Sequence, residues 1–340
     1  SPVTYIEGDS GDTTTDIASQ TVDSQLAQGV NAIIGAASSG VSLTVIDKIT
    51  TNGVVQFSPA NTAPNLTTYE DNGLYFRNAP SDVLQGAVLA GKAIDAGIAN
   101  MATIARQDPY GEGLAAAVVK DFTAAGGNIT SELLYDPAAP SFEAEVAEIV
   151  AGAPEAVVVV GFDESTKLIQ EMIKQGAGPD KIQLYLVDGN ASTTAFAEFP
   201  AGTMAGTVAT FPSGSVDVKT FNDRMLAFDP SLTDFLYGPQ SFDATMLIAL
   251  AAQQAGCADG TSIAANLISV AGDGGEECTT YADCVALIDA GTAIDYMGVN
   301  GGSDFNQYGD LLEGTISINE YSSNTEYEEI GSLTAVVPEP

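Results

Sequence analysis

The run Ala156-Val157-Val158-Val159-Val160, followed by Gly161-Phe162, is the stretch of sequence that decides the fold. Consecutive β-branched residues favour a strand over a helix. Because no polar residue alternates with them, we expect both faces of this strand to be buried, which is typical of a parallel sheet covered by helices. The stretch therefore predicts an α/β protein.

Similar short runs lie on both sides of it and alternate with segments of helical period. Expected strands are 3–6, 30–34, 54–57, 74–77, 101–105, 129–135, 182–187 and 207–211. The segments between them carry apolar residues at every fourth position, as in Leu114, Val118 and Phe122. After residue 211 helical periods dominate, until 314–318 and 328–337 alternate like antiparallel strands. This order predicts parallel sheets with helices on both faces.

Length and charge narrow the class of protein. At 340 residues the chain is longer than a single hydrophobic core usually serves, and its 45% apolar residues are enough to build the cores of two lobes. Its 45 acids and 10 bases give a net charge of −35, which repels nucleic acid and anionic lipid. Such a surface is typical of a secreted or salt-tolerant protein, and we expect no nucleic-acid partner.

The chain contains no histidine, which argues against most enzyme classes. The commonest general base, the usual zinc ligand and every Ser-His-Asp arrangement are excluded with it. A G-x-G-x-x-G motif after a strand is also missing, so we expect no dinucleotide cofactor. The segment 304–309 faintly resembles a calcium loop, but Tyr308 and Thr315 stand where ligands should be. We therefore expect neither an enzyme nor a metal site.

Three cysteines occur, and two of them lie close together in the sequence. Cys278 and Cys284 are near enough to form a disulfide in an oxidising compartment, and two free thiols are the alternative. Cys257 is then left over. No run of 18 apolar residues is present, so we expect no membrane span.

Ligands of open parallel sheets bind beyond the carboxyl ends of the strands. The loops 35–40 and 58–64 follow two expected strands and are rich in small and hydroxylic residues. Backbone N–H groups and hydroxyls at helix starts suit a carboxylate without a basic side chain. Ordinary helix capping by Ser39 and Thr62 is the alternative interpretation.

Other strand ends carry an acid and two aromatic residues. Asp188 follows the strand 182–187 and could receive an ammonium group, although a helix cap would look the same. Tyr110 and Phe162 follow the strands 101–105 and 156–160 and could form the wall of an apolar pocket, or belong to the core.

A series of short motifs adds a resemblance to a known family. In chain order they are Ile33-Ile34-Gly35 with Ser38-Ser39, Phe57-Ser58-Pro59-Ala60 to Thr62-Ala63-Pro64, Phe76-Arg77 with Asp82 and Gly86, Asp108 to Tyr110-Gly111-Glu112-Gly113, Phe235 to Tyr237 with Phe242-Asp243-Ala244, and Asp304-Phe305 with Gly309-Asp310. Their order and spacing resemble the branched-chain amino-acid-binding proteins of ABC importers, which have the type I periplasmic binding-protein fold.

The resemblance implies two Rossmann-like lobes joined by three hinge crossings, near Pro80, near Phe211–Pro212 and near Gly314. Lobe one would comprise residues 1–80 and 212–314, and lobe two residues 81–211 and 315–340. The ligand would lie in the cleft between the lobes.

The resemblance also implies a role for individual residues. Ser39, the backbone of Ala60, and Thr62 would hold a ligand carboxylate, and Asp188 would bind its ammonium group. Relatives often carry a Glu at that acid position. Tyr110 would stack on the ligand and Phe162 would form an aromatic wall, while the choices at Asn61 and Phe162 leave the ligand side chain open.

The function implied is the solute-binding subunit of an ABC importer, which captures a small amino acid, branched-chain or otherwise aliphatic or polar, and delivers it to a membrane permease. Its location would be extracellular or periplasmic, with a lipid anchor conceivable in a segment outside this sequence. The same fold binding an amide, a urea or an aromatic carboxylate, or serving as a sensory module, is the alternative.

The sequence departs from the family pattern at its start. In the family a strand and a helix precede the segment that resembles residues 3–6. That strand is expected in the middle of the lobe-one sheet, between residues 3–6 and 30–34. Without it, two rows of backbone groups lack a ladder partner.

Overall fold

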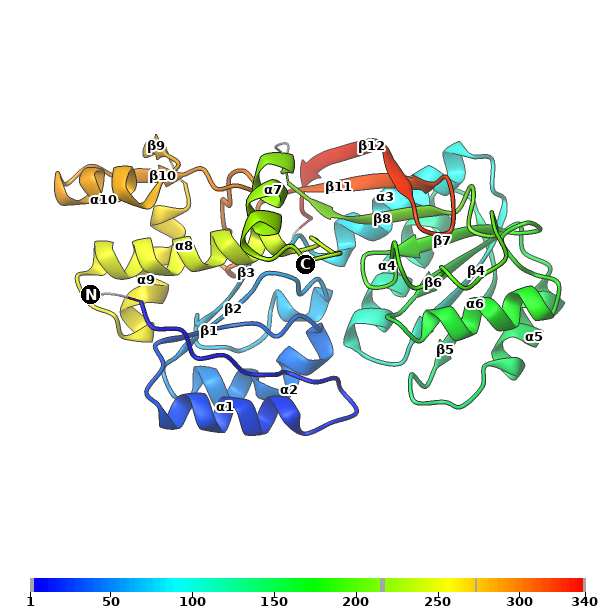
Figure 1. The fold of residues 1–340 in the computed structure, drawn as a ribbon, viewed down its shortest axis with the longest axis horizontal. Coiled ribbons are helices and arrows are strands. Elements are labelled where there is room, and N and C mark those ends of the chain that lie inside the picture. Colours follow the sequence, from blue (N-terminus) through cyan, green and yellow to red (C-terminus); the bar gives the residue numbers. More distant parts are fainter. Residues whose placement is uncertain (1–2, 215–217, 273, 339–340) are drawn as a thin grey trace. The chain divides into compact units, whose positions relative to one another are not determined.

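The computed structural model describes residues 3–214, 218–272 and 274–338, and in it the chain forms two compact units (Figure 1). Unit 1 comprises Ser1–Ser81 and Gly214–Gly314, and unit 2 comprises Asp82–Ser213 and Thr315–Pro338. The chain therefore passes between the units after Ser81, Ser213 and Gly314.

Unit 2 is built on a seven-stranded sheet of order β12-β11-β8-β7-β6-β4-β5. Its strands are β4 (Asn100–Arg106), β5 (Asn128–Tyr135), β6 (Ala156–Val160), β7 (Gln183–Val187), β8 (Val208–Ser213), β11 (Glu313–Tyr321) and β12 (Tyr327–Val336). Its helices are α3 (Asp82–Asp95), α4 (Pro109–Ala124), α5 (Glu143–Gly152) and α6 (Ser165–Lys174). The strands β4 to β8 pair in parallel, and β11 pairs antiparallel with β8.

The polyvaline strand β6 explains why this unit is layered. Val157 and Val159 pack in one cluster with the apolar faces of α5 and α6, whereas Val158 and Val160 pack in another with α4. All of these side chains are fully buried. Because successive strand residues point to opposite faces, the unbroken apolar run requires helices on both sides of the sheet, as the sequence predicts.

Unit 1 holds a three-stranded parallel sheet of β1 (Ala32–Ile34), β2 (Val55–Ser58) and β3 (Tyr75–Arg77). Its helices are α1 (Ile17–Ala27), α2 (Ser39–Thr50), η1 (Pro64–Leu66), α7 (Lys219–Phe228), α8 (Gly238–Ala255), α9 (Gly260–Val270) and α10 (Tyr281–Asp289). A separate parallel pair, β9 (Glu276–Cys278) and β10 (Ile294–Tyr296), is absent from the sequence prediction. Cys278 of β9 forms a disulfide with Cys284 of α10, and Cys257 is free and exposed.

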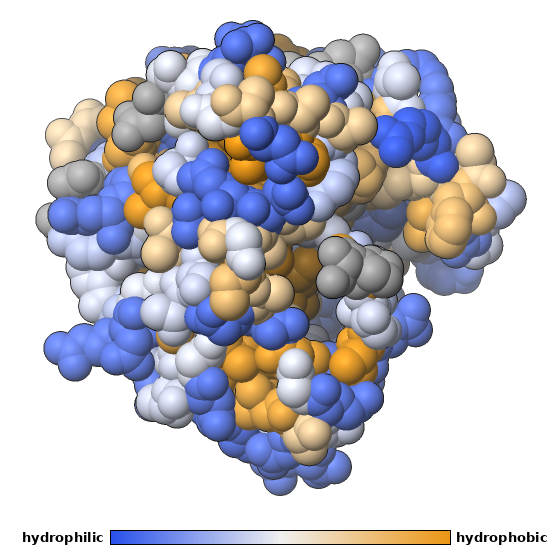
Figure 2. Space-filling model, turned by 90° about the vertical axis from the view of Figure 1, so that its left-hand side faces the viewer, coloured by the Kyte–Doolittle hydropathy of each residue, from blue (hydrophilic) through white to orange (hydrophobic). Residues whose placement is uncertain are grey.

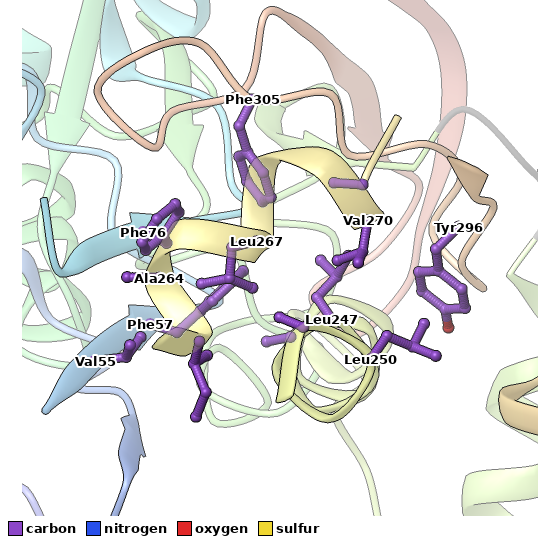
Figure 3. Packing of buried hydrophobic residues seen from close by; sticks show 14 of the residues in the cluster. Val55, Phe57, Phe76, Leu247, Leu250, Ala264, Leu267, Val270, Tyr296 and Phe305 are labelled. Atoms are coloured by element: carbon purple, nitrogen blue, oxygen red, sulfur yellow. The ribbon is translucent and has the colours of Figure 1, made fainter. Parts of the chain in front are cut away.

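Helices α8 and α9 form the core of unit 1 with the strands. Figure 3 shows Leu247 and Leu250 of α8 beside Leu267 of α9, with strand residues on the other side of α9. The rings of Phe57, Phe76 and Phe305 contact one another, with centroids 5.8 to 6.2 Å apart. Aromatic packing of this kind fixes the carboxyl ends of β2 and β3 against the segment around Phe305.

The prediction of a strand at residues 3–6 is wrong. Residues 3–12 form neither helix nor strand, and Val3 and Tyr5 are 62% and 68% exposed. The segment is held through side chains, with Gln25 Nε2 donating to the Ile6 carbonyl at 3.3 Å. A β-branched run becomes a strand only where it pairs with a neighbouring strand, and among the described residues β1 pairs with β2 alone. A hollow of about 50 Å³ is lined by residues 8–10, α1, β1 and α2.

Among the described residues, no helix has both the length and the apolar character needed to cross a membrane.

Candidate ligand-binding site

Two loops of unit 1 are joined at the carboxyl ends of β1 and β2. Ser58 donates its hydroxyl to the Ala36 carbonyl at 2.8 Å. Asn61 donates its amide to the carbonyls of Ala36 and Ala37, at 3.0 and 2.8 Å. These bonds bring the loops 35–40 and 58–64 together at the carboxyl ends of the strands, which is where the sequence predicts them.

Ser39 links the two loops instead of capping a helix. The N-cap of α2 is Ser38, whose side chain accepts from the Val41 N–H. Ser39 is buried, and its Oγ accepts from the backbone N–H groups of Thr62 and Ala63, at 3.2 Å each. The capping interpretation of Ser39 is therefore wrong, and its hydroxyl lies directly beside Thr62.

Thr62 carries a buried hydroxyl that has no hydrogen-bond partner within the described part of the chain. The residue is 1% exposed, and its Oγ1 is unsatisfied. Leaving such a group unpaired costs about 1–3 kcal/mol, so a buried hydroxyl of this kind calls for an external partner. Ala60, which is 7% exposed, lies two residues before it. The hydroxyl of Thr62 can bind a ligand oxygen without breaking an existing bond.

Asn61 and Arg77 hold this loop in place. The Oδ1 of Asn61 accepts from the Tyr75 hydroxyl at 2.9 Å, so that both ends of its amide serve the fold. Arg77 is fully buried, binds Asp310 through Nε and Nη2 at 2.7 Å each, and donates to the Ala63 carbonyl at 2.9 Å. Because Asp310 neutralises Arg77, the donors at the Ser39–Thr62 group are uncharged.

Unit 2 places Asp188 beside Tyr110 at the carboxyl end of its own sheet. Asp188 directly follows β7, and Tyr110 lies in the first turn of α4, which Asp108 caps. The Tyr110 hydroxyl donates to Asp188 Oδ1 at 2.9 Å, and Gln85 Nε2 donates to the same oxygen at 3.0 Å. Asp188 is 7% exposed. The result is a nearly buried carboxylate whose orientation is fixed by two neutral donors.

Phe162 stacks on Tyr110 and forms an aromatic wall next to Asp188. The two ring centroids are 5.3 Å apart, with the planes 10° from parallel. The guanidinium of Arg106 lies 4.0 Å from the centroid of the Phe162 ring. Arg106 in turn binds Asp108 at 2.6 Å and Glu164 at 3.2 Å, and it is fully buried. The contacts of this buried arginine hold the Phe162 ring in place.

Two glycines allow this close approach. A Cβ at Gly189 would lie 2.5 Å from the Gly161 carbonyl and 2.7 Å from the Phe162 ring. A Cβ at Gly161 would lie closer still to the Tyr135 hydroxyl. Any side chain at either position would displace the loops that follow β6 and β7.

Sequence reasoning identified Tyr110, Phe162 and Asp188 from their places after strands, but it missed Gln85 and Arg106. Both missed residues are fully buried polar side chains. For Gln85 a signal existed, because an amide stands within the apolar face of α3 between Leu84 and Val88. Within the described ranges, no group of three or more His, Cys, Asp or Glu side chains could hold a metal ion.

Comparison with known proteins agrees with this architecture. The chain is 31% identical over 247 residues to Leu/Ile/Val-binding protein homolog 1 of Brucella abortus, and 28% identical over 283 residues to the substrate-binding protein of a chemotactic signal transduction system from Halobacterium salinarum. These matches cover 70% and 80% of this chain, but the chain spans only 64% and 65% of those proteins.

The fold is also found among solved structures. A leucine-binding protein from Thermotoga maritima superimposes with a TM-score of 0.77 at 19% identity, covering 95% of this chain and 85% of that one. A family model described as periplasmic binding protein matches residues 1–279. The chain therefore belongs to the periplasmic binding protein family.

Proposed function

We propose that this protein captures a small aliphatic amino acid, with the branched-chain amino acids as the first candidates. In this proposal Ser39, Thr62 and the backbone at Ala60 bind the ligand carboxylate. Asp188 binds the ammonium group, while Tyr110 and Phe162 contact the rest of the molecule. The family is one of solute-binding proteins, not of enzymes.

The observation that carries the proposal is the contrast between the two groups of residues. Unit 1 offers uncharged donors and, on Thr62, a buried hydroxyl that has no hydrogen-bond partner among the described residues. Unit 2 offers a nearly buried carboxylate, on Asp188, held in one orientation. A zwitterion presents the complementary charges, because a carboxylate suits N–H and O–H donors and an ammonium suits a carboxylate. An amide or an aromatic acid has no ammonium group to offer this carboxylate.

The biological setting is part of the same proposal. The similarity to the Leu/Ile/Val-binding protein homolog of Brucella abortus supports delivery of the ligand to the permease of an ABC transporter. We place the protein outside the cell or in the periplasm, where the Cys278–Cys284 disulfide would persist.

The proposal is tested by ligand screening with two matched variants. A thermal-shift screen of the twenty amino acids, with amides and aromatic carboxylates alongside, identifies the ligand; stabilisation of ~2.7 kcal/mol is expected at a hundredfold excess over Kd. Asp188→Asn keeps an oxygen for Tyr110 and Gln85 but removes the charge, so affinity for an amino acid should fall by at least about tenfold. Glu148→Ala, an exposed acid on α5, is the control and should bind as the wild type does.

Two results would contradict the proposal. One is a cooperative melt that no amino acid shifts but an amide or aromatic acid does. The other is an Asp188→Asn variant with unchanged amino-acid affinity, which would remove the assigned ammonium partner.

A sensory role is the second candidate, because one similar protein, from Halobacterium salinarum, belongs to a chemotactic signal transduction system. Deleting the gene separates the two roles. Loss of labelled amino-acid uptake supports transport, whereas intact uptake with lost chemotaxis towards the same amino acid supports sensing.

A further inference from the structure

Gln85 is a buried amide that no motif singles out and that contacts the proposed ammonium-binding acid. It lies in the first turns of α3 and is fully buried. Its Nε2 donates to Asp188 Oδ1 at 3.0 Å and to the Thr210 carbonyl at 2.9 Å. One side chain therefore joins α3, the loop after β7 and the strand β8.

The orientation of this amide is fixed by its surroundings. An amide nitrogen has two hydrogens, and here one faces a carboxylate oxygen and the other a backbone carbonyl, both of which only accept. Turning the amide over would place its oxygen against both acceptors. Gln85 Oε1 has no hydrogen-bond partner within the described residues. The amide therefore donates to Asp188 and Thr210 while its own oxygen stays unsatisfied.

We infer that Gln85 is a positioning residue for amino-acid binding, which holds the Asp188 carboxylate in the orientation that receives the ligand's ammonium group. This inference rests on the proposed function. Tyr110 and Gln85 donate to the same oxygen, Oδ1, and together they define the direction in which the carboxylate group points. Phe162 stacks on the Tyr110 ring, whose hydroxyl contacts this acid.

The location of Gln85 also ties the acid to the segments by which the chain enters and leaves unit 2. Gln85 follows the Ser81–Asp82 passage by a few residues, and Thr210 precedes the Ser213–Gly214 passage by a few residues. Within the sheet, Thr210 is in register with Val187, the residue before Asp188. A single amide, that of Gln85, therefore connects the Asp188 carboxylate to the two segments by which the chain enters and leaves unit 2.

The test compares two ligands that differ only at the ammonium group: L-leucine and L-2-hydroxy-4-methylpentanoate. Kd values are measured by titration calorimetry on the full chain for the wild type, Gln85→Met and Gln85→Ala. Loss of an oriented charge-assisted contact should weaken L-leucine binding by about tenfold or more, and binding of the hydroxy acid by less than about threefold. Gln85→Ala is the second variant because it leaves room for water at the Thr210 carbonyl if the methionine variant does not fold.

The matched control is Gln183→Met in the same unit. Gln183 Nε2 also donates to two carbonyls, those of Gly206 and Leu184, and within the described ranges it has no hydrogen bond to a carboxylate. Its L-leucine affinity should equal that of the wild type. A purely structural role for Gln85 would weaken both ligands by the same factor, and that result, or unchanged L-leucine affinity, overturns the inference. If the wild type binds none of L-leucine, L-isoleucine and L-valine, the proposed branched-chain function itself fails and the inference fails with it.

Discussion

Asp243 is the clearest example, at the scale of single residues, of a buried charge whose surroundings change its chemistry. It lies on α8, is fully buried, and accepts hydrogen bonds from the Tyr296 hydroxyl at 3.0 Å and from the N–H groups of Val299 and Asn300 at 2.9 and 2.8 Å. Burial outweighs these donors and raises the pKa of Asp243 from 3.8 to about 6.

A raised pKa in the folded state makes stability depend on pH in a defined direction. Between pH 4 and 6 the folded protein binds more protons at Asp243 than the unfolded chain does. The free energy of unfolding should therefore fall as pH rises through this window, with a contribution of up to about 3 kcal/mol from this carboxyl. Urea unfolding of the wild type and of Asp243→Asn, at half-unit steps from pH 4 to 7, measures it.

The difference between the two proteins isolates Asp243 from the many other acids of the chain. Wild-type stability minus variant stability should decrease from pH 4 to 6 and become constant above about pH 7. A difference that is flat across this window would show that the carboxyl titrates with the same pKa in both states.

At the scale of elements, α3 and α4 approach each other unusually closely at Gly86. A Cβ at Gly86 would lie 2.5 Å from the Cβ of Ala117 and 2.9 Å from backbone atoms of Ala117 and Val118. Gly86→Ala should therefore destabilise the protein by roughly 1–3 kcal/mol, because backbone atoms must move to make room. Since α3 carries Gln85, amino-acid affinity should fall as well.

The same helix offers the control. Gly91 also lies within α3, but a Cβ there would meet nothing within 4 Å. Gly91→Ala should stabilise the protein by about 0.5–1 kcal/mol, because alanine favours the helix. Chemical denaturation measures the free energy of unfolding of both variants. Equal effects of the two substitutions would disprove the close approach at Gly86.

Elements differ in how far the sequence alone could reveal them. The strand β6 was predictable because an unbroken β-branched run requires burial on both faces. The strands β9 and β10 were not, because each is three residues long and β9 begins with two exposed glutamates. Residues 3–6 have the composition of a strand, yet a strand also needs a neighbour, and that depends on the rest of the sheet.

The residues of the candidate site also differ in how far the sequence alone could reveal them. Asp188 and Tyr110 were predicted as site residues because ligands of parallel sheets bind beyond the carboxyl ends of strands, and the structure brings these two side chains together. Gln85 contacts Asp188, which is more than fifty residues away, and Arg106 joins the nearby Asp108 to Glu164, which is equally distant in the sequence. Local sequence therefore carries little trace of their roles. Thr62 was singled out, but its unsatisfied hydroxyl became visible only in three dimensions.

At the scale of the whole molecule, the net charge of −35 dominates the electrostatics. Figure 2 shows hydrophilic residues over much of the visible face, with hydrophobic patches between them. Arg77 and Arg106, two of the ten basic residues, are buried against Asp310, Asp108 and Glu164 and so neutralise internal carboxylates. The surface acids are left with few cations, and they repel one another most strongly in the compact state.

Salt should therefore stabilise this protein to an unusual degree. Raising NaCl from about 0.05 M to 1 M shortens the Debye length from more than 10 Å to ~3 Å, which screens repulsion between exposed carboxylates. The melting temperature should rise steadily over this range, by ~1–2 °C for each kcal/mol of repulsion removed. Scanning calorimetry at pH 7 measures the rise, and because exposed ion pairs contribute little, their loss in salt should not offset it.

Screening must be separated from the general stabilisation that excluded salts produce. KCl and NaCl at equal ionic strength should act alike, whereas a salting-out effect would be stronger with sulfate at the same ionic strength. Glu145→Gln and Glu148→Gln together remove two negative charges from α5 and should reduce the slope of melting temperature against salt. If the slope is unchanged, or if the wild type melts at the same temperature at both ends of the range, self-repulsion does not limit the stability of the fold.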